Sequence, residues 1–369
     1  MIPLFKPSIG EEEINALMET FKTSWIGAGP KTVKFEEEFA KYLDVKYAIG
    51  VNSCTAALDL ALKTLDIDGG EVIAPTLTFV STFHAVMYNN AKPVFADINR
   101  GTLTIDVKDI EKKISKKTKA VILVHMGGQP CDMDSILKIA KSYNLYVVED
   151  VAHALGGEYK NKKMGTFGEF GCFSFEAKKN MTTGDGGMIV TNNSDKVDRL
   201  KRLRWLGIDK DTWKRYGKKT KRHWYYEVPE LGYKCHMNDI QAAIGLVQLK
   251  KLDEFNRKKR DIIKVYMNEL KNIPWIELPE DVDLEKGCYW VFIIKVENRD
   301  DFVSYMLDNE ITTGVHYMPV HLHPYYRRFK AYCPVAEEVW RKIVSLPLFP
   351  DMTEIQLEKV VNTIKKFKN

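Results

Sequence analysis

Short apolar runs alternate with amphipathic helical patterns through the first half of the chain. Strand-like apolar runs are found at 47–51, 71–75, 92–98, 119–125, 146–150 and 187–191. Apolar residues recur at helical spacing in 10–22, 31–43, 55–65, 78–89, 106–116 and 133–143. Buried strands separated by amphipathic helices are typical of a mostly parallel sheet covered on both faces. The sequence therefore predicts an α/β fold.

The second half of the chain has a different pattern. Residues 238–270 form one long helical stretch, followed by strand-like runs at 290–296 and 312–317 and by a closing helix after Thr353. A chain of 369 residues is long enough for two domains. We expect a large domain at 1–250, built on a mostly parallel mixed sheet flanked by helices. A smaller C-terminal α+β domain is expected at 251–369.

Charge and hydropathy exclude two classes of partner. Lys and Arg total 55 against 50 Asp and Glu, and the resulting charge of +5 is spread along the chain. A nucleic-acid-binding domain concentrates its basic residues, so no nucleic-acid partner is expected. The stretch Lys214–Arg222 is a local exception, for which both a solvated loop and a surface that meets a diphosphate remain open. No run approaches about 18 apolar residues, so no membrane partner is expected.

The six cysteines are scattered, and no two form a CxxC pair. Zinc ribbons and small disulfide frameworks are therefore not expected, and no metal site is predicted. The opening MIPLFKPSIGEEE places three acids ahead of any long apolar run, unlike a secretory signal peptide. A cytoplasmic location is the resulting expectation.

Four motifs lie at or just after the strand-like runs, where ligands bind in an open parallel sheet. The first is NSCTAAL at 52–58, which places small polar residues at the start of a helix. Backbone N–H groups at a helix N-terminus, with the Ser53 and Thr55 hydroxyls, suit a phosphate dianion. An ordinary capped helix is the alternative.

The second motif is VVEDVAHALGG at 147–157, with adjacent acids at the end of an apolar strand. An Asp in that place can hold a cationic ring nitrogen through a charge-assisted hydrogen bond. A helix N-cap is the alternative interpretation.

The third motif is CFSFEAKKNMTTGDGGMIVT at 172–191, in which Ser174 stands five residues before Lys179. A lysine held among apolar and small residues can lose its proton and form a Schiff base. Most lysines are solvated surface residues, so the surrounding motif carries this hypothesis. The fourth motif, TLTFVSTFHAV at 76–86, offers Phe79 as a ring that stacks on a flat ligand or packs in the core.

Together the motifs resemble one family, the sugar aminotransferases of the DegT/DnrJ/EryC1/StrS group, which are fold type I enzymes dependent on pyridoxal 5′-phosphate. The resemblance runs from about residue 3 to residue 356, and the SF-x-x-x-K pattern with its glycine-rich turn is its most specific part. It rests on these segments: WIGAGPKTVKFEEEFA, NSCTAALDLAL, PTLTFVSTFHA, VHMGGQPCDM, VEDVAHALGG, SFEAKKNMTTGDGG, LGYKCHMNDIQAAIG, HYMPVHLHPYY and SLPLFPDMTEIQ.

The resemblance implies roles for residues around the cofactor. It makes Lys179 the lysine that bonds the cofactor, whereas Lys178 occupies a position that varies in the family. Asp150 would pair with the pyridine nitrogen, and Phe79 would stack on one face of the ring. His153 stands where the family has Gln or His near the cofactor hydroxyl.

The phosphate group would be held by Cys54, Thr55 and Ser174. Cys54 replaces the family's usual Gly, so only a backbone contact is implied there. Lys234 stands where many members have an Asn that reaches the phosphate of a neighbouring subunit, and a lysine can do this as a point charge. Glu176 replaces a frequent His, and neither it nor His84 is given a role.

The resemblance further implies an activity. We expect amino transfer from Glu to a keto-sugar nucleotide, with a 4-keto-6-deoxy sugar favoured, in surface polysaccharide or glycoconjugate biosynthesis. A sugar dehydratase of the same family and a non-catalytic regulatory protein are the alternatives. The active unit would be a homodimer with shared sites, and Trp25 and 214–226 would border the sugar-nucleotide site.

Overall fold

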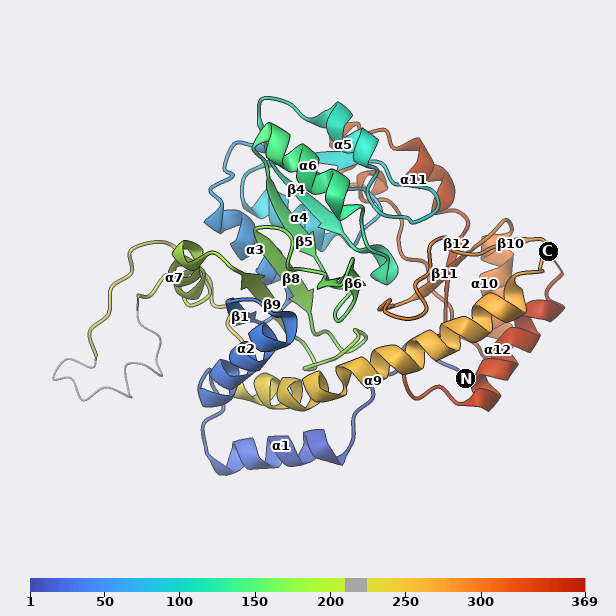
Figure 1. Cartoon of the computed structure of the whole chain (residues 1–369), viewed down its shortest axis with the longest axis horizontal. Helices are drawn as coiled ribbons and strands as arrows, with labels where there is room; N and C mark the ends of the chain where they lie inside the picture. The colour runs from blue at the N-terminus through green and yellow to red at the C-terminus, as the bar shows by residue number, and fades with distance from the viewer. Residues whose placement is uncertain (210–223, 369) are drawn as a thin grey trace.

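The computed structural model of the chain describes residues 1–209 and 224–368, and the basic stretch Lys214–Arg222 lies outside the described residues. Figure 1 shows the order of the elements. The first part of the chain forms α1 (Glu11–Lys22), α2 (Pro30–Leu43), β1 (Tyr47–Val51), α3 (Cys54–Thr64), β2 (Glu71–Pro75), α4 (Ser81–Tyr88), β3 (Lys92–Ala96), α5 (Val107–Lys113), β4 (Thr118–Val124), η1 (Met126–Gly128), α6 (Met133–Tyr143), β5 (Tyr146–Asp150), β6 (Glu158–Tyr159), β7 (Lys162–Lys163), β8 (Phe170–Ser174), β9 (Gly187–Thr191) and α7 (Ser194–Leu203). The second part forms α9 (Asp239–Leu270), β10 (Ile276–Glu277), β11 (Phe292–Val296), α10 (Arg299–Asp308), η2 (Val320–Leu322), η3 (Arg327–Phe329), α11 (Pro334–Val339), β12 (Ile343–Leu346) and α12 (Glu354–Lys366).

The large sheet has seven strands in the order β1-β9-β8-β5-β4-β2-β3. Strands β8, β5, β4, β2 and β3 pair in parallel, and β9 is antiparallel to both β1 and β8. The expected mostly parallel mixed sheet is therefore confirmed. Because β5 and β8 are parallel neighbours, their carboxyl ends open at the same edge of the sheet.

Alternate residues of each strand face opposite sides of the sheet, and both sides are apolar. In β4, Ala120 and Ile122 pack in one core cluster, while Val121 and Leu123 pack in another on the opposite face. This two-sided burial explains why the strands consist of continuous apolar runs rather than alternating ones.

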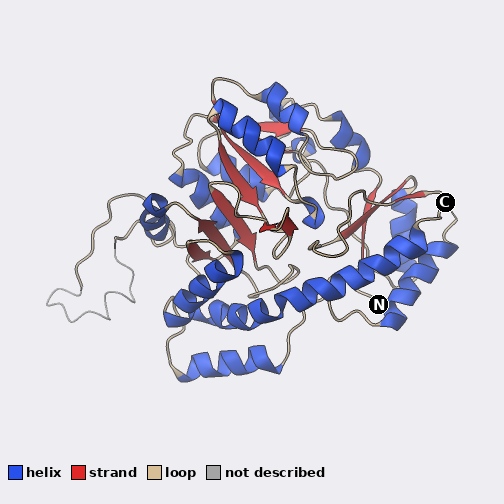
Figure 2. Ribbon diagram, in the orientation of Figure 1, coloured by secondary structure: helices blue, strands red, loops and turns tan. Residues whose placement is uncertain are grey.

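Helices cover both faces of the large sheet, as Figure 2 shows. Helices α3, α4 and α7 contribute to the cluster on one face, and α2, α5, α6 and α9 contribute to the clusters on the other. No described helix is long and apolar enough to cross a membrane.

Helix α9 runs from the large sheet to a second, three-stranded sheet of order β10-β11-β12 (Figure 1). Its start is fixed by a capping box between Asn238 and Gln241. The second sheet packs with α10 and α12 around its own apolar cluster, which also takes in Ile2 from the start of the chain. The helix passes residue 250 without a break, and the division into domains 1–250 and 251–369 stays a prediction.

Three amide side chains on α9 hold the loop that follows Lys179. Gln241 donates to the Asp185 carbonyl (2.7 Å), Gln248 accepts from the Thr182 N–H (3.3 Å), and Asn256 accepts from the Asn180 side chain (2.8 Å). Spacings of seven and eight residues are close to two helical turns, so one face of α9 presents all three. Helix α9 therefore supports this loop through three hydrogen bonds along one face.

The expected secondary structure differs from the structure at several places, two of which concern segments at the cavity. The run 312–317 forms no strand and contributes only an isolated bridge from Gly314 to Ser345. Its Thr, Val and Tyr residues are typical of strands, but the side chains of His316 and Tyr317 pack against Trp290 at the cavity instead. Conversely, β8 was not expected as a strand because its residues were interpreted as part of the lysine motif.

Candidate active site

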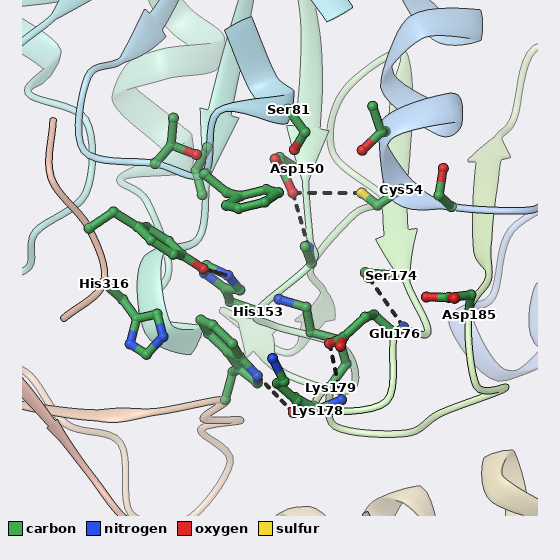
Figure 3. Close-up of a pocket in the computed structure, with 18 of the residues that line it drawn as sticks. Cys54, Ser81, Asp150, His153, Ser174, Glu176, Lys178, Lys179, Asp185 and His316 are labelled. Carbon is green, nitrogen blue, oxygen red and sulfur yellow. Dashed lines mark hydrogen bonds between the residues drawn. The ribbon is translucent and has the colours of Figure 1, made fainter. Parts of the chain in front are cut away.

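A cavity of about 410 Å³ opens at the carboxyl ends of β5 and β8 (Figure 3). The start of α3, the turn before α4 and the loop before β9 complete one side, which we call the sheet wall. The other side, the C-terminal wall, is formed by Trp290, His316 and Tyr317. Of the sequence-predicted site residues, the cavity brings together all except one: Cys54, Thr55, Phe79, Asp150, His153, Ser174 and Lys179.

Asp150 is the last residue of β5 and is only 4% exposed. One carboxylate oxygen accepts a hydrogen bond from the Ala152 N–H (3.1 Å), and the other accepts one from the Thr82 hydroxyl (3.0 Å). Burial raises the pKa of Asp150, and these two donors and nearby Lys179 oppose that rise. The carboxylate is thus held in one orientation at the end of the strand, and a cationic ligand would favour its charged form.

Lys179 lies in the turn after β8, where its backbone N–H donates to the Glu176 carbonyl (2.9 Å). Burial lowers the pKa of the Lys179 amine to about 8, although Asp150 acts in the opposite direction. A lysine in this condition has a neutral fraction of roughly a tenth at pH 7, far more than an ordinary lysine, and the neutral amine is the nucleophile. Lys178, by contrast, is exposed, although it too lines the cavity.

The first turn of α3 supplies backbone donors to the cavity. Ser53 caps the helix by accepting from the Ala56 N–H (3.1 Å), and no described residue accepts from the N–H groups of Cys54 and Thr55. Gly187 permits this helix to approach β9, because a Cβ there would lie 2.5 Å from the Ser53 backbone. The unpaired N–H groups and the helix dipole favour an anion at this end.

Ser174 ends β8 on the same side of the cavity as Cys54 (Figure 3). Its hydroxyl accepts a weak hydrogen bond from the Glu176 N–H (3.4 Å), and one of the Glu176 carboxylate oxygens accepts from the Lys178 N–H (3.1 Å). The Cys54 thiol contacts an oxygen of Asp150 at 3.9 Å, and burial raises the pKa of this thiol. Cys54 is therefore a neutral thiol rather than a thiolate nucleophile.

His153 is buried, and burial lowers its pKa well below the ordinary value, with Lys179 and His316 acting in the same direction. The ring is therefore neutral. Its Nδ1 accepts from the Gly127 N–H (3.5 Å), which assigns the proton to Nε2, 3.2 Å from the Tyr317 hydroxyl oxygen. With Nε2 donating, the Tyr317 O–H remains available to another acceptor.

The C-terminal wall was not expected from the sequence. Trp290 stacks on His153 with ring centroids 4.0 Å apart, and His316 meets Trp290 edge-on at 4.8 Å. The His316 Nδ1 is 2.8 Å from the Ser345 hydroxyl, and burial lowers the pKa of His316 to about 4. The one sequence signal for this wall was the segment HYMPVHLHPYY, which contributes to the family resemblance but to whose side chains no role was given.

Phe79 is 55% exposed, and its ring lies 5.8 Å from that of Tyr317 at the cavity. An aromatic side chain this exposed is not a core residue, which leaves the stacking hypothesis open. Thr82, which holds Asp150, was also missed, although it belongs to the same TLTFVSTFHAV motif.

Lys234 is the site residue that the cavity of its own chain does not include. Its amine lies 5.8 Å from the centre of the Trp205 ring, and its backbone pairs with Trp205. Trp25 does not line the cavity either, and its indole N–H donates to the Ala28 carbonyl (3.1 Å). The expected border segment 214–226 lies mostly outside the described residues, and its described part, 224–226, is exposed.

The residues present fit a phosphorylated aldehyde with a basic ring nitrogen. Lys179 offers an amine for the aldehyde, Asp150 offers a buried carboxylate for the nitrogen, and the start of α3 offers N–H groups for the phosphate. Within residues 1–209 and 224–368, no three His, Cys, Asp or Glu side chains gather as metal ligands.

Comparison with known proteins extends over nearly the whole chain. The model of the DegT/DnrJ/EryC1/StrS aminotransferase family matches residues 7–365. The spore coat polysaccharide biosynthesis protein SpsC of Bacillus subtilis is 40% identical, over 99% of this chain and 96% of its own. The GDP-perosamine synthase of Escherichia coli O157:H7 is 37% identical, over 99% of this chain and 98% of its own.

The same relationship appears in solved structures. Spr1654 of Streptococcus pneumoniae, described as a sugar aminotransferase and solved in PMP and PLP forms, has a TM-score of 0.92 in its PMP form. That structure is 29% identical and is matched over 99% of this chain and 98% of its own. The fold is that of the pyridoxal-phosphate-dependent aminotransferases, and the cofactor is pyridoxal 5′-phosphate. The chain belongs to the DegT/DnrJ/EryC1/StrS aminotransferase family.

Proposed function

We propose that this aminotransferase transfers an amino group from glutamate to a nucleotide-linked keto sugar, with a 4-keto-6-deoxy sugar favoured. The product would enter surface polysaccharide or glycoconjugate biosynthesis. The observation that carries the proposal is the pair of groups at one cavity, half-buried Lys179 with its pKa lowered to about 8 and the buried Asp150 carboxylate. Relatives named for spore coat polysaccharide and for GDP-perosamine support the sugar class. A cytoplasmic location stays a prediction.

Asp150 and Lys179 carry the proposed reaction. When bound, pyridoxal phosphate supplies an aldehyde that condenses with amines and a protonated ring that accepts an electron pair from the adjacent carbon. Asp150, oriented by Thr82 and the Ala152 N–H, holds the proton on the ring nitrogen through a charge-assisted hydrogen bond. The neutral Lys179 amine takes the proton from the substrate carbon and returns it to the cofactor carbon.

The remaining proposed site residues bind and orient. The Cys54 and Thr55 N–H groups, together with the Ser174 hydroxyl, hold the phosphate at the start of α3. Phe79 covers one face of the ring. His153 would face the ring hydroxyl, and because its proton is on Nε2, the Tyr317 O–H would be the group free to donate there.

Retention of Lys179 favours amino transfer over the two alternatives. A dehydratase of this family replaces this lysine with histidine, and position 179 is a lysine here. A regulatory protein that only binds a ligand has no need for an amine of lowered pKa next to a buried carboxylate. Such a perturbed amine beside a buried carboxylate is characteristic of a site at which a proton is moved.

The active unit in this proposal is a homodimer in which Lys234 of one chain reaches the phosphate bound by the other. Lys234 is exposed and lies outside the cavity of its own chain, so its charge is available to a second copy. Mixing inactive Lys179→Ala and inactive Lys234→Glu chains tests this. Recovery of part of the activity is expected, because one site of the mixed dimer has both native residues. No recovery despite proven subunit exchange would contradict the shared site.

The substrate is tested directly with purified protein. Incubation with glutamate and a panel of keto-sugar nucleotides, 4-keto and 3-keto, should give an amino sugar identified by mass and by the position of its amine. The Lys179→Ala protein is the control. Loss of the sugar hydroxyl without gain of nitrogen would establish the dehydratase instead, and no product from any sugar would leave the regulatory alternative.

A further inference from the structure

Trp290 lies where the two walls of the cavity meet. It is only 3% exposed, lies just before β11 of the small sheet, and its backbone N–H donates to the Gly127 carbonyl on the sheet side (3.0 Å). From this position the Trp290 side chain contacts residues of both walls. Two of its contacts concern the turn that carries Lys179.

The first contact holds the backbone of the lysine turn. The Trp290 indole N–H donates to the carbonyl oxygen of Lys178 at 2.8 Å, in a partly buried hydrogen bond. Such a bond is directional, and the peptide group that it fixes joins Lys178 to Lys179. The bond therefore sets the position from which the Lys179 side chain leaves the backbone.

The second contact holds the side-chain amine. The Lys179 Nζ lies over the Trp290 ring, 3.7 Å from its centre. An ammonium over an indole face is attracted by the negative charge of that face, and the attraction grows when water is excluded. The ring gives the amine a defined position when no ligand is bonded to it.

Stacking keeps the indole from turning away. His153 is stacked on it at 4.0 Å with the planes 12° apart, and Phe5 from the start of the chain is stacked at 5.0 Å with the planes 11° apart. His316 packs edge-on against the same indole ring. A ring confined in this way keeps one position, from which it can hold the lysine turn. We call this hold on the turn the anchor.

We propose that Trp290 is the positioning residue of Lys179: its indole N–H fixes the lysine turn, and its ring face holds the amine whenever that amine is released. The importance of that position for amino transfer rests on the proposed function, but the two contacts do not. The measurements below therefore use no turnover.

The N–H contact is tested by hydrogen exchange on the holoenzyme. Trp290→Phe keeps an aromatic ring and removes the donor, so amides in 175–183 should exchange about three- to tenfold faster, the effect of one lost partly buried hydrogen bond. Amides in α3, whose start lines the same wall without contacting Trp290, should not change. Trp275→Phe is the matched control, since Trp275 packs on Phe302 and Phe367 of the small-sheet region. Unchanged exchange at 175–183 would overturn the anchor.

The ring contact is tested on the full chain freed of cofactor. Acetylation of Lys179 is followed by mass spectrometry from pH 6 to 10, with exposed Lys178 in the same peptide as the internal reference. Both Trp290→Phe and Trp290→Leu lack the donor, but only Phe keeps a ring face. The pKa of Lys179 should therefore be lower in Trp290→Leu by roughly half a pH unit to one.

An equal or higher Lys179 pKa in Trp290→Leu would overturn the ring contact. Should the Leu protein not fold, the exchange result with Trp290→Phe still decides the anchor. A wild-type protein that binds pyridoxal phosphate but aminates no sugar would contradict the proposed function and leave both Trp290 measurements valid.

Discussion

The two walls of the cavity are built on different principles. The sheet wall presents polar groups, Asp150, Ser174 and Lys179, at the ends of strands whose length and direction are set by the core. The C-terminal wall presents rings, Trp290 and Tyr317, that touch one another and His153. The comparison teaches that the charged groups of the cavity lie on the sheet wall, whereas the C-terminal wall consists of aromatic side chains. The rate of the reaction should therefore depend on the sheet wall, and the alignment of the reacting groups should depend on the C-terminal wall.

The strongest way to break this comparison is Lys179→Ala. Loss of the amine that moves the proton should lower amino transfer by about 10⁴-fold or more, since general acid–base catalysis and covalent capture of the cofactor fail together. Rates of product formation measure this. Lys178→Ala is the matched neighbour and should keep the visible absorption of the bound cofactor; loss of that absorption from the Lys178 protein alone would shift the assignment by one residue.

Asp150→Asn should have the next largest effect. The amide is nearly the same shape but cannot hold a proton on the ring nitrogen as an anion, so turnover should fall by roughly 10²–10³-fold while the fold is kept. Steady-state kinetics and a thermal melt check this together. Near-normal turnover would remove Asp150 from the proposed role.

Lys179→Met should stabilise the cofactor-free chain. The folded pKa of about 8 lies below the ordinary 10.5, so the penalty for burying the charged amine is fully present below pH 8 and disappears as pH rises to 10.5. The gain at pH 7 should be about 1–3 kcal/mol in the free energy of unfolding and should shrink toward pH 10. Urea unfolding at both pH values measures it. Lys178→Met should change little, and an equal gain there would contradict a specific burial cost.

Tyr317→Phe should have the smallest effect. The His153 Nε2–H loses its acceptor, which should lower the free energy of unfolding by about 1 kcal/mol, with a change in turnover of only a few fold. Exposed Tyr325 provides the control, Tyr325→Phe. A loss of turnover as large as that of Asp150→Asn would show that chemistry is not confined to the sheet wall.

The sheet wall could be predicted because its residues follow local patterns. Asp150 ends an apolar run and Ser53 precedes a helical one, and the topology of a parallel sheet then brings such ends together. The C-terminal wall could not be predicted in this way. Trp290 and Tyr317 lie 27 residues apart in segments without periodicity, and only tertiary packing turns their rings toward His153. The run 312–317 shows the converse, because its β-branched and aromatic residues predicted a strand, whereas the structure bridges only Gly314 to Ser345.

The three side chains of α9 that hold the loop after Lys179 have a consequence for engineering this protein by mutagenesis. At two of its three points the helix holds backbone atoms of the loop, the Asp185 carbonyl and the Thr182 N–H. Contacts of this kind do not depend on which side chain the loop carries. A library that randomises exposed Asp185 at the cavity should therefore retain a high proportion of folded members, and new sugar preferences can be selected from it without rebuilding the scaffold.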